Sequence, residues 1–239
     1  MTRVRALSFD LDYTLWSLDQ VIERAEARTR AFFARSYPAV AEQYNPARIA
    51  TLRQQVLDEE PGIAHDLREL RLRTLRRLAA GCGCPPAAAE QALDVFMEAR
   101  NEVAIYAETR PLLERLHRRY TLVALTNGNA DIHRIGLGHY FRAAILAADV
   151  GAAKPSALMF EAALRGAGAS PGELLHVGDD PETDVFGAAR LGIGAVWVNR
   201  TAMPWPEHLP RVPHVEIRTL AELPGVLQDH SAPLEGRGL

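Results

Sequence analysis

The stretch "FDLDYTLW", residues 9–16, closes an apolar run that begins at residue 4 and has the length of a buried strand. It places Asp10 and Asp12 one residue apart, where the strand would end. Two carboxylates this close repel each other unless a cation or a proton sits beside them. A solvated turn could carry the same residues, but the other strand ends described below favour a functional site.

The rest of the chain shows two sequence patterns, one after the other. Residues 19–104 show apolar residues at three- to four-residue spacing in four segments bounded by Gly and Pro, which predicts helices at 19–37, 46–60, 64–81 and 86–106. After them, strand and helix patterns alternate to about residue 228, including "TLVALTNGN", "ELLHVGDD" and "GAVWVN" as strands. Short helices are predicted at 130–141 and over the "ETDVFGAARLG" segment.

This order predicts an α/β fold, with a doubly wound parallel sheet and a helical domain inserted after its first strand. The expected division is residues 1–15 and 107–230 for the α/β core, 16–106 for the helical insertion and 231–239 for a flexible tail.

Composition excludes several classes of protein. The 239 residues are 48% hydrophobic and carry a formal net charge of -3, which disfavours a nucleic-acid partner. We see no signal peptide and no apolar run long enough to span a membrane. Cys82 and Cys84 are too close for an unstrained disulfide and lack a second pair for zinc, so we expect reduced thiols in a cytoplasmic protein, monomeric or weakly dimeric.

Polar residues gather at four predicted strand ends. Because ligands bind beyond the carboxyl ends of parallel strands, these positions should converge on one site. They are Asp10, Asp12 and Thr14; Thr126 and Asn127; Lys154; and Asp179, Asp180 and Asp184.

Such a set suits phosphoryl transfer. Several carboxylates in one cleft need a cation, and hard oxygen ligands favour Mg²⁺ with a phosphate. One aspartate could attack phosphorus to give an aspartyl-phosphate, while a second passes a proton to the leaving alcohol and later takes one from water. Lys154 is the only lysine among 27 basic residues, which chance could produce and which a site that needs a compact ammonium would also produce.

The motifs "DLDYTL", "LTNGN", "KPS" and "HVGDDPETD" resemble, in this order, the haloacid dehalogenase (HAD) superfamily of hydrolases, over residues 4–228. That resemblance implies a Rossmann-like core with a cap. It implies Asp10 as nucleophile, Asp12 as general acid/base, Thr126 and Asn127 as phosphate binders, and Lys154 as the neutralising ammonium. It makes Asp179 the Mg²⁺ ligand with Asp10 and the backbone carbonyl of Asp12. Thr14, Asp180 and Asp184 would support these ligands or act as auxiliary ones.

A closer likeness, mostly in the core, is to bacterial flavin mononucleotide (FMN) phosphatases of this superfamily, which implies a small phosphorylated metabolite as substrate. The alternatives are a haloacid dehalogenase, a phosphomutase or, from another class, a phospho-accepting receiver module. Dehalogenases lack the second aspartate, so Asp12 favours a phosphatase. Receivers are shorter, lack a helical insertion and carry these motifs in a different order.

Overall fold

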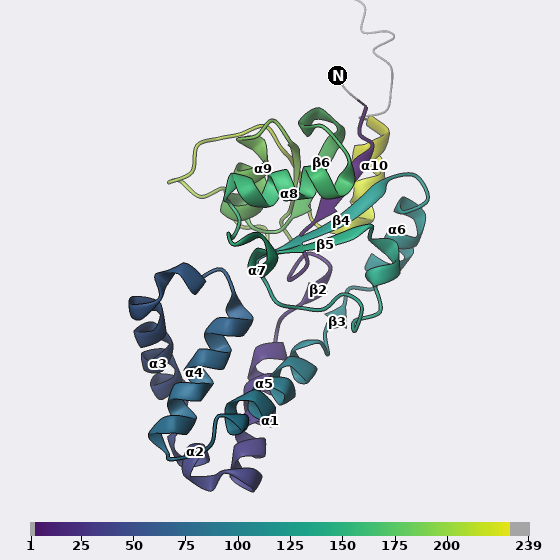
Figure 1. Ribbon diagram of the computed structural model, residues 1–239. Helices are drawn as coiled ribbons and strands as arrows, with labels where there is room; N and C mark the ends of the chain where they lie inside the picture. Colours follow the sequence, from purple (N-terminus) through teal and green to yellow (C-terminus); the bar gives the residue numbers. More distant parts are fainter. Residues whose placement is uncertain (1–2, 230–239) are drawn as a thin grey trace, which may run out of the picture.

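A six-stranded parallel sheet organises the described part of the chain, residues 3–229 of the computed structural model (Figure 1). Its order is β5-β4-β1-β6-β7-β8, and every neighbouring pair is parallel. The strands are β1 (Ala6–Phe9), β4 (Thr121–Thr126), β5 (Ala143–Leu146), β6 (Leu174–Gly178), β7 (Gly194–Val198) and β8 (Val215–Ile217). The predicted tail at 231–239 lies outside the described residues.

The order of the strands fixes where a ligand can bind. From β1 the chain runs outward through β4 to β5, and it then returns to β6 on the other side of β1. This reversal opens a crevice at the carboxyl end of β1, the place where ligands bind in open α/β sheets. The "DLD" motif follows β1 directly and therefore lies at that crevice.

Helices cover both faces of the sheet, as the alternating strand pattern predicts. On one face, α6 (Thr109–Leu116) and α10 (Leu223–Asp229) pack on β1 through a cluster that includes Leu7 and Phe9. On the other, α8 (Ala157–Ala167) and α9 (Gly187–Ala189) pack on a cluster that includes Ala6. Successive residues of a buried strand point to opposite faces, so one apolar run serves both clusters.

Five helices form an insertion between β1 and the rest of the sheet. They are α1 (Val21–Ser36), α2 (Pro38–Gln43), α3 (Pro46–Glu59), α4 (Leu67–Gly81) and α5 (Ala87–Arg100). A short antiparallel pair, β2 (Trp16–Ser17) and β3 (Ala104–Ile105), carries the chain out of the sheet domain and back (Figure 1). We call α1–α5 the helical insertion; Phe33 and Leu93 lie in its own apolar core.

Several short elements complete the described chain. They are η1 (Pro61–Ile63), η2 (Gly138–Tyr140), α7 (Ala147–Val150), η3 (Pro171–Glu173), the π-helical turn η4 (Pro181–Phe186) and η5 (Leu220–Glu222). None of the helices within residues 3–229 has the length and hydropathy of a membrane span.

Three details of the sequence prediction were wrong. Residues 130–141 form turns and η2 in place of a helix, because Asp131 binds the backbone N–H of His133 and Gly136 adopts a left-handed φ of 80°. The helix predicted over 86–106 ends at Arg100 and gives way to β3. The short α2 was not predicted; it begins at Pro38, a residue common in the first turn of a helix.

Candidate active site

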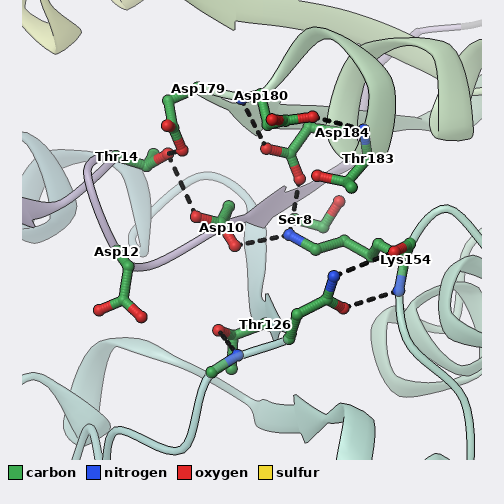
Figure 2. A network of polar contacts seen from close by, with 12 residues as sticks. Ser8, Asp10, Asp12, Thr14, Thr126, Lys154, Asp179, Asp180, Thr183 and Asp184 are labelled. Atoms are coloured by element: carbon green, nitrogen blue, oxygen red, sulfur yellow. Dashed lines mark hydrogen bonds and ion pairs between the residues drawn. The ribbon is translucent and has the colours of Figure 1, made fainter. Parts of the chain in front are cut away.

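Asp10 and Lys154 are the centre of a buried polar network at the carboxyl end of β1 (Figure 2). The Nζ atom of Lys154 lies 2.5 Å from Oδ1 of Asp10 and 2.6 Å from Oδ1 of Asp184. The side chain of Lys154 is 2% exposed, so its ammonium depends on these two carboxylates in place of water. Burial works against the charged ammonium, but Asp10 and Asp184 raise the pKa of Lys154 above its ordinary value.

Three of the carboxylates lie close enough to share a cation. Asp10, Asp179 and Asp184 each offer an oxygen, and these oxygens lie within 4.8 Å of one another. Thr14 links two of them, because its hydroxyl lies 3.1 Å from Oδ1 of Asp179 and 3.5 Å from Oδ2 of Asp10. A group of hard oxygen donors with a surplus of negative charge fits a divalent cation such as Mg²⁺.

The pKa shifts of the carboxyl groups indicate the same surplus of negative charge. Burial raises the pKa of Asp10 well above its ordinary value, and the charges of Asp184 and Asp179 add to this, although Lys154 opposes it. Burial together with the charge of Asp184 raises the pKa of Asp179 to about 7. The single ammonium therefore does not compensate the two buried carboxylates and the half-buried Asp179, and a bound cation would lower the pKa values of Asp10 and Asp179.

Asp184 is held in place by the local fold of "GDDPETD". Asp180 caps η4, because its Oδ1 accepts hydrogen bonds from the backbone N–H groups of Glu182 (2.9 Å) and Thr183 (2.7 Å). The turn brings Asp184 back under β6, where its Oδ2 accepts from the N–H of Asp180 at 3.0 Å. Gly178 is required there, since a Cβ at that position would lie 2.3 Å from the Asp184 carboxyl carbon.

Asp184 has a second buried support that sequence reasoning missed. Nε2 of His176 lies 3.0 Å from Oδ1 of Asp184, and Nδ1 lies 2.8 Å from the hydroxyl of Ser8. Burial lowers the pKa of His176, so the neutral ring donates from Nε2 and accepts from Ser8 at Nδ1. Burial opposes ionisation of Asp184, yet Lys154 and His176 hold the pKa of its carboxyl below the ordinary value.

Thr126 is the last residue of β4 and Asn127 follows it, at the same end of the sheet as Asp10. Oγ1 of Thr126 accepts from the backbone N–H of Gly128 at 2.9 Å, which shapes the turn. The Asn127 side chain binds the backbone of Lys154, accepting from its N–H at 2.6 Å and donating to its carbonyl at 3.0 Å. The Asn127 amide therefore fixes the segment that carries Lys154, whereas sequence analysis assigned it to phosphate.

Asp12 is oriented differently from Asp10, and its side chain points away from the Asp10–Lys154 network (Figure 2). Oδ1 of Asp12 accepts from the Trp16 indole N–H at 2.7 Å. Nη2 of Arg100 lies 2.8 Å from Oδ1 and 2.6 Å from Oδ2 of Asp12. Arg100 is the last residue of α5, so a side chain of the helical insertion contacts the aspartate expected to move protons.

Arg100 could not be found from sequence. It is separated from Asp12 by 88 positions and resembles the many other arginines of the insertion. Its only distinguishing feature is that it ends a helix whose continuation, β3, pairs with the strand that follows Asp12. Between Asp12 and Thr14, Tyr13 adopts a left-handed φ of 58°, a strained conformation typical of functional loops.

Taken together, this geometry defines a hydrolase of the HAD type, and comparison with known proteins agrees. Residues 4–192 match the haloacid dehalogenase-like hydrolase family, and the chain belongs to that family.

Three proteins of known name are similar to the chain over most of its length. The chain is 37% identical over 233 residues to 5-amino-6-(5-phospho-D-ribitylamino)uracil phosphatase YigB of Escherichia coli (strain K12), covering 94% of this chain and 97% of that protein. Its fold matches the crystal structure of a 2-haloacid dehalogenase from Pseudomonas syringae pv. Tomato DC3000 with a TM-score of 0.89 and 35% identity, covering 95% and 99% of the two chains. A HAD phosphatase from Thermococcus onnurineus matches with a TM-score of 0.64 and 26% identity, over 94% and 98%.

Proposed function

We propose that this chain is a divalent-metal-dependent phosphatase that hydrolyses a small phosphomonoester through an aspartyl-phosphate at Asp10. The observation that carries the proposal is the convergence of the Asp10, Asp179 and Asp184 oxygens within 4.8 Å, with the Lys154 ammonium 2.5 Å from Asp10. The similarity to a phosphatase over nearly the whole chain supports it.

In this mechanism Asp10 attacks phosphorus. A bond forms between its carboxylate oxygen and phosphorus while the bond from phosphorus to the ester oxygen breaks. Asp12 donates a proton to the departing alkoxide and then takes one from the water that hydrolyses the aspartyl-phosphate, which restores both carboxyl groups. Lys154 and the hydroxyl of Thr126 offset charge on the phosphate oxygens.

Asp10 and Asp179, with the backbone carbonyl of Asp12, would hold the metal; Asp184 lies close enough to contribute directly or through water. Mg²⁺ is our choice of ion because the donors are all hard oxygens. When bound, such an ion reduces the repulsion between the carboxylates and an anionic phosphate.

For the substrate we propose a ribityl-type phosphate, either FMN or the phosphoribitylamino-uracil named for the Escherichia coli relative. We further propose a cytoplasmic location, with which the unpaired thiols of Cys82 and Cys84 are consistent.

A haloacid dehalogenase is the second candidate, because a structure with that name matches closely. The presence of a second carboxylate, Asp12, favours the phosphatase. A halide leaves without a proton, whereas an alkoxide needs one, and Asp12 is positioned by both Trp16 and Arg100 at the edge of the site.

The test compares two products in one preparation. With Mg²⁺ present, we expect continuous phosphate release from FMN and p-nitrophenyl phosphate and no halide release from 2-chloropropionate. EDTA should abolish phosphate release, and added Mg²⁺ should restore it while Ca²⁺ should not, because Ca²⁺ prefers more ligands at longer distances. Halide release without phosphate release would overturn the proposal.

A further inference from the structure

A cavity of about 740 Å³ extends from the candidate active site into the helical insertion. Asp12 and Gly128 line it on the sheet side, and residues of α1, α3, α4 and α5 line the rest. Its volume falls in the range of sites that enclose a whole small molecule and far exceeds the need of one phosphate group. The part of a substrate beyond its phosphate would therefore lie against the insertion.

The walls of this cavity are largely apolar. Side chains from three different helices contribute to them, with Ile22 on α1, Leu70 on α4 and Phe96 on α5. Phe96 and Leu70 are each 2% exposed and hence fixed by packing on their other sides. Apolar and aromatic surfaces of this kind favour a flat, weakly hydrated group over an open polyol chain.

Among the polar residues of the lining, which also include Arg30 and Arg53, three form a connected cluster. Oε1 of Glu26 lies 2.8 Å from Nη1 of Arg71, and Oε2 accepts a hydrogen bond from the Tyr44 hydroxyl. All three residues line the cavity. Tyr44 is buried, and burial together with the charge of Glu26 raises the pKa of its phenol, so it remains a neutral donor.

Arg71 combines charge with a flat surface. Its guanidinium carbon lies 3.5 Å from the centre of the Phe96 ring, so the planar fork is stacked against an aromatic face. Within residues 3–229 the pair with Glu26 is its only ion pair, and this uses Nη1, which leaves the other N–H groups of the fork for a carbonyl oxygen.

The sheet-side end of the cavity has an unsatisfied donor. Nη1 of Arg100 is buried and lacks a hydrogen-bond partner among the described residues, although Nη2 of the same side chain binds Asp12. Arg100 is 2% exposed and lines the cavity. A buried donor without a partner is rare in native proteins and points to an acceptor atom supplied by a ligand.

The charge balance of the cluster limits what can bind. Glu26 and Arg71 pair with each other, so this cluster suits a ligand edge that carries both a hydrogen-bond donor and an acceptor. A purely alkyl ligand would remove water from Glu26, which is 33% exposed, and from Arg71, which is 21% exposed, without replacing their hydrogen bonds. A neutral ring with N–H and C=O groups on one edge replaces both.

We propose that Glu26, Tyr44 and Arg71 bind the carbonyl- and N–H-bearing edge of a neutral, planar heterocycle in the substrate, and that this ring determines specificity. The inference rests on the proposed phosphatase function for its kinetic test only. It predicts that the enzyme recognises its substrate by the ring and not by the sugar-like chain that carries the phosphate.

FMN and ribitol 5-phosphate provide the comparison, because they share the phosphorylated chain and differ by the ring. We expect the wild type to favour FMN in kcat/KM by at least tenfold. Glu26→Gln and Arg71→Met should reduce that preference about 10- to 100-fold, mainly through KM for FMN, as expected for lost hydrogen bonds to charged groups. Their kcat for ribitol 5-phosphate should stay within about threefold of the wild type.

A matched control lies on the same helix. Arg76 of α4 pairs with Glu90 at 2.8 Å, and both side chains are well exposed and outside the cavity. Arg76→Met should leave kinetics with both esters unchanged. Equal losses on FMN and ribitol 5-phosphate in the Glu26 and Arg71 variants, or an unchanged preference, would overturn the proposal.

Riboflavin separates this proposal from the phosphatase function, since it carries the ring without a phosphate. Its fluorescence should change on titration with the wild type and with Arg76→Met, and binding should be at least tenfold weaker for Glu26→Gln and Arg71→Met. We expect this difference in riboflavin binding even if no ester is hydrolysed. Absence of hydrolysis would reject the proposed phosphatase function but not the ring site. A well-folded wild type that does not bind riboflavin would overturn the ring site even if the variants fail to fold.

Discussion

At the scale of single residues, the site depends on a few contacts between groups that are distant in sequence. The residue types at the strand ends could be predicted, because Asp, Thr and Lys together at the carboxyl ends of parallel strands favour a phosphate site over a solvated turn. Their partners could not. The bond from Asn127 to the Lys154 backbone and the support of Asp184 by His176 depend on the register of β1, β4 and β6, which sequence periodicity does not give.

Loss of the Lys154 ammonium should affect both stability and activity. Lys154→Met leaves Asp10 and Asp184 buried without their counter-charge, so we expect the free energy of unfolding to fall by about 3–5 kcal/mol and phosphate release to fall at least 100-fold. Lys154→Arg should keep more stability but remain poorly active, because a planar fork does not fit between two oxygens bound by a compact ammonium. Chemical unfolding and phosphate release measure the two effects. Full activity in the arginine variant would show that the point charge is dispensable.

Gly128 tests the position of Asp12. A Cβ at Gly128 would lie 2.6 Å from Oδ2 of Asp12 and 3.1 Å from Oγ1 of Thr126. Gly128→Ala should therefore displace Asp12 and lower kcat about 10- to 100-fold, within the range that proton transfer contributes. Gly62→Ala is the control, since no atom lies within 4 Å of its added Cβ. Equal kcat in the two variants would contradict this account of Asp12.

At the scale of secondary structure, the sequence predicted long elements well and short ones poorly. Amphipathic helices such as α4 and buried strands such as β6 carry enough residues to define a period. The two-residue strands β2 and β3 do not, and they form because the insertion must leave and rejoin the sheet domain at one point. α2 was missed for the same reason, since six residues hold less than two turns.

The contact between α5 and the strand-end loop should be a measurable link between the insertion and the sheet domain. Arg100→Met removes the partner of Asp12 from an ion pair in which the arginine side chain is 3% exposed, so we expect a loss of about 2 kcal/mol in the free energy of unfolding. Arg28→Met breaks the exposed pair between Arg28 and Glu102, which water screens, and should lower the free energy of unfolding much less. Equal costs in chemical denaturation would show that burial does not strengthen the Asp12 pair.

Glu108 ties three elements together and gives the fold an acid-sensitive contact. Its Oε1 accepts from Arg200 and from Thr219, each at 2.9 Å. Burial opposes ionisation, but its backbone hydrogen bond, Arg200 and Thr219 together lower the pKa of Glu108 below its ordinary value of 4.5. A lowered pKa means that this stabilisation is complete above pH 4.5 and is lost as the pH falls through the lower, folded-state value.

The Glu108→Gln variant isolates that contribution. It should be less stable than the wild type at pH 7 by about 1 kcal/mol, and the difference should shrink as the pH falls from 5 to 3. Urea unfolding at each pH measures both proteins. A difference that is constant with pH would mean that the charge of Glu108 contributes nothing.

At the scale of the whole molecule, a doubly wound sheet supplies the site and a helical insertion supplies the rest of the cavity. The fold class could be predicted because alternation of strands and helices leaves few topologies. The cavity could not, because it depends on how α1, α3, α4 and α5 pack over the end of the sheet. The sequence therefore predicts the candidate catalytic residues, whereas the cavity proposed for the rest of the substrate is evident only from the structure.

The proposed reaction begins with attack of the Asp10 carboxylate on phosphorus. Its most direct test is phosphate release from p-nitrophenyl phosphate by Asp10→Asn, measured with saturating Mg²⁺ on protein shown to be folded by circular dichroism. We expect a loss of at least 1,000-fold, because an amide cannot form the aspartyl-phosphate and the other groups act only when that intermediate forms. Turnover within tenfold of the wild type would contradict this mechanism.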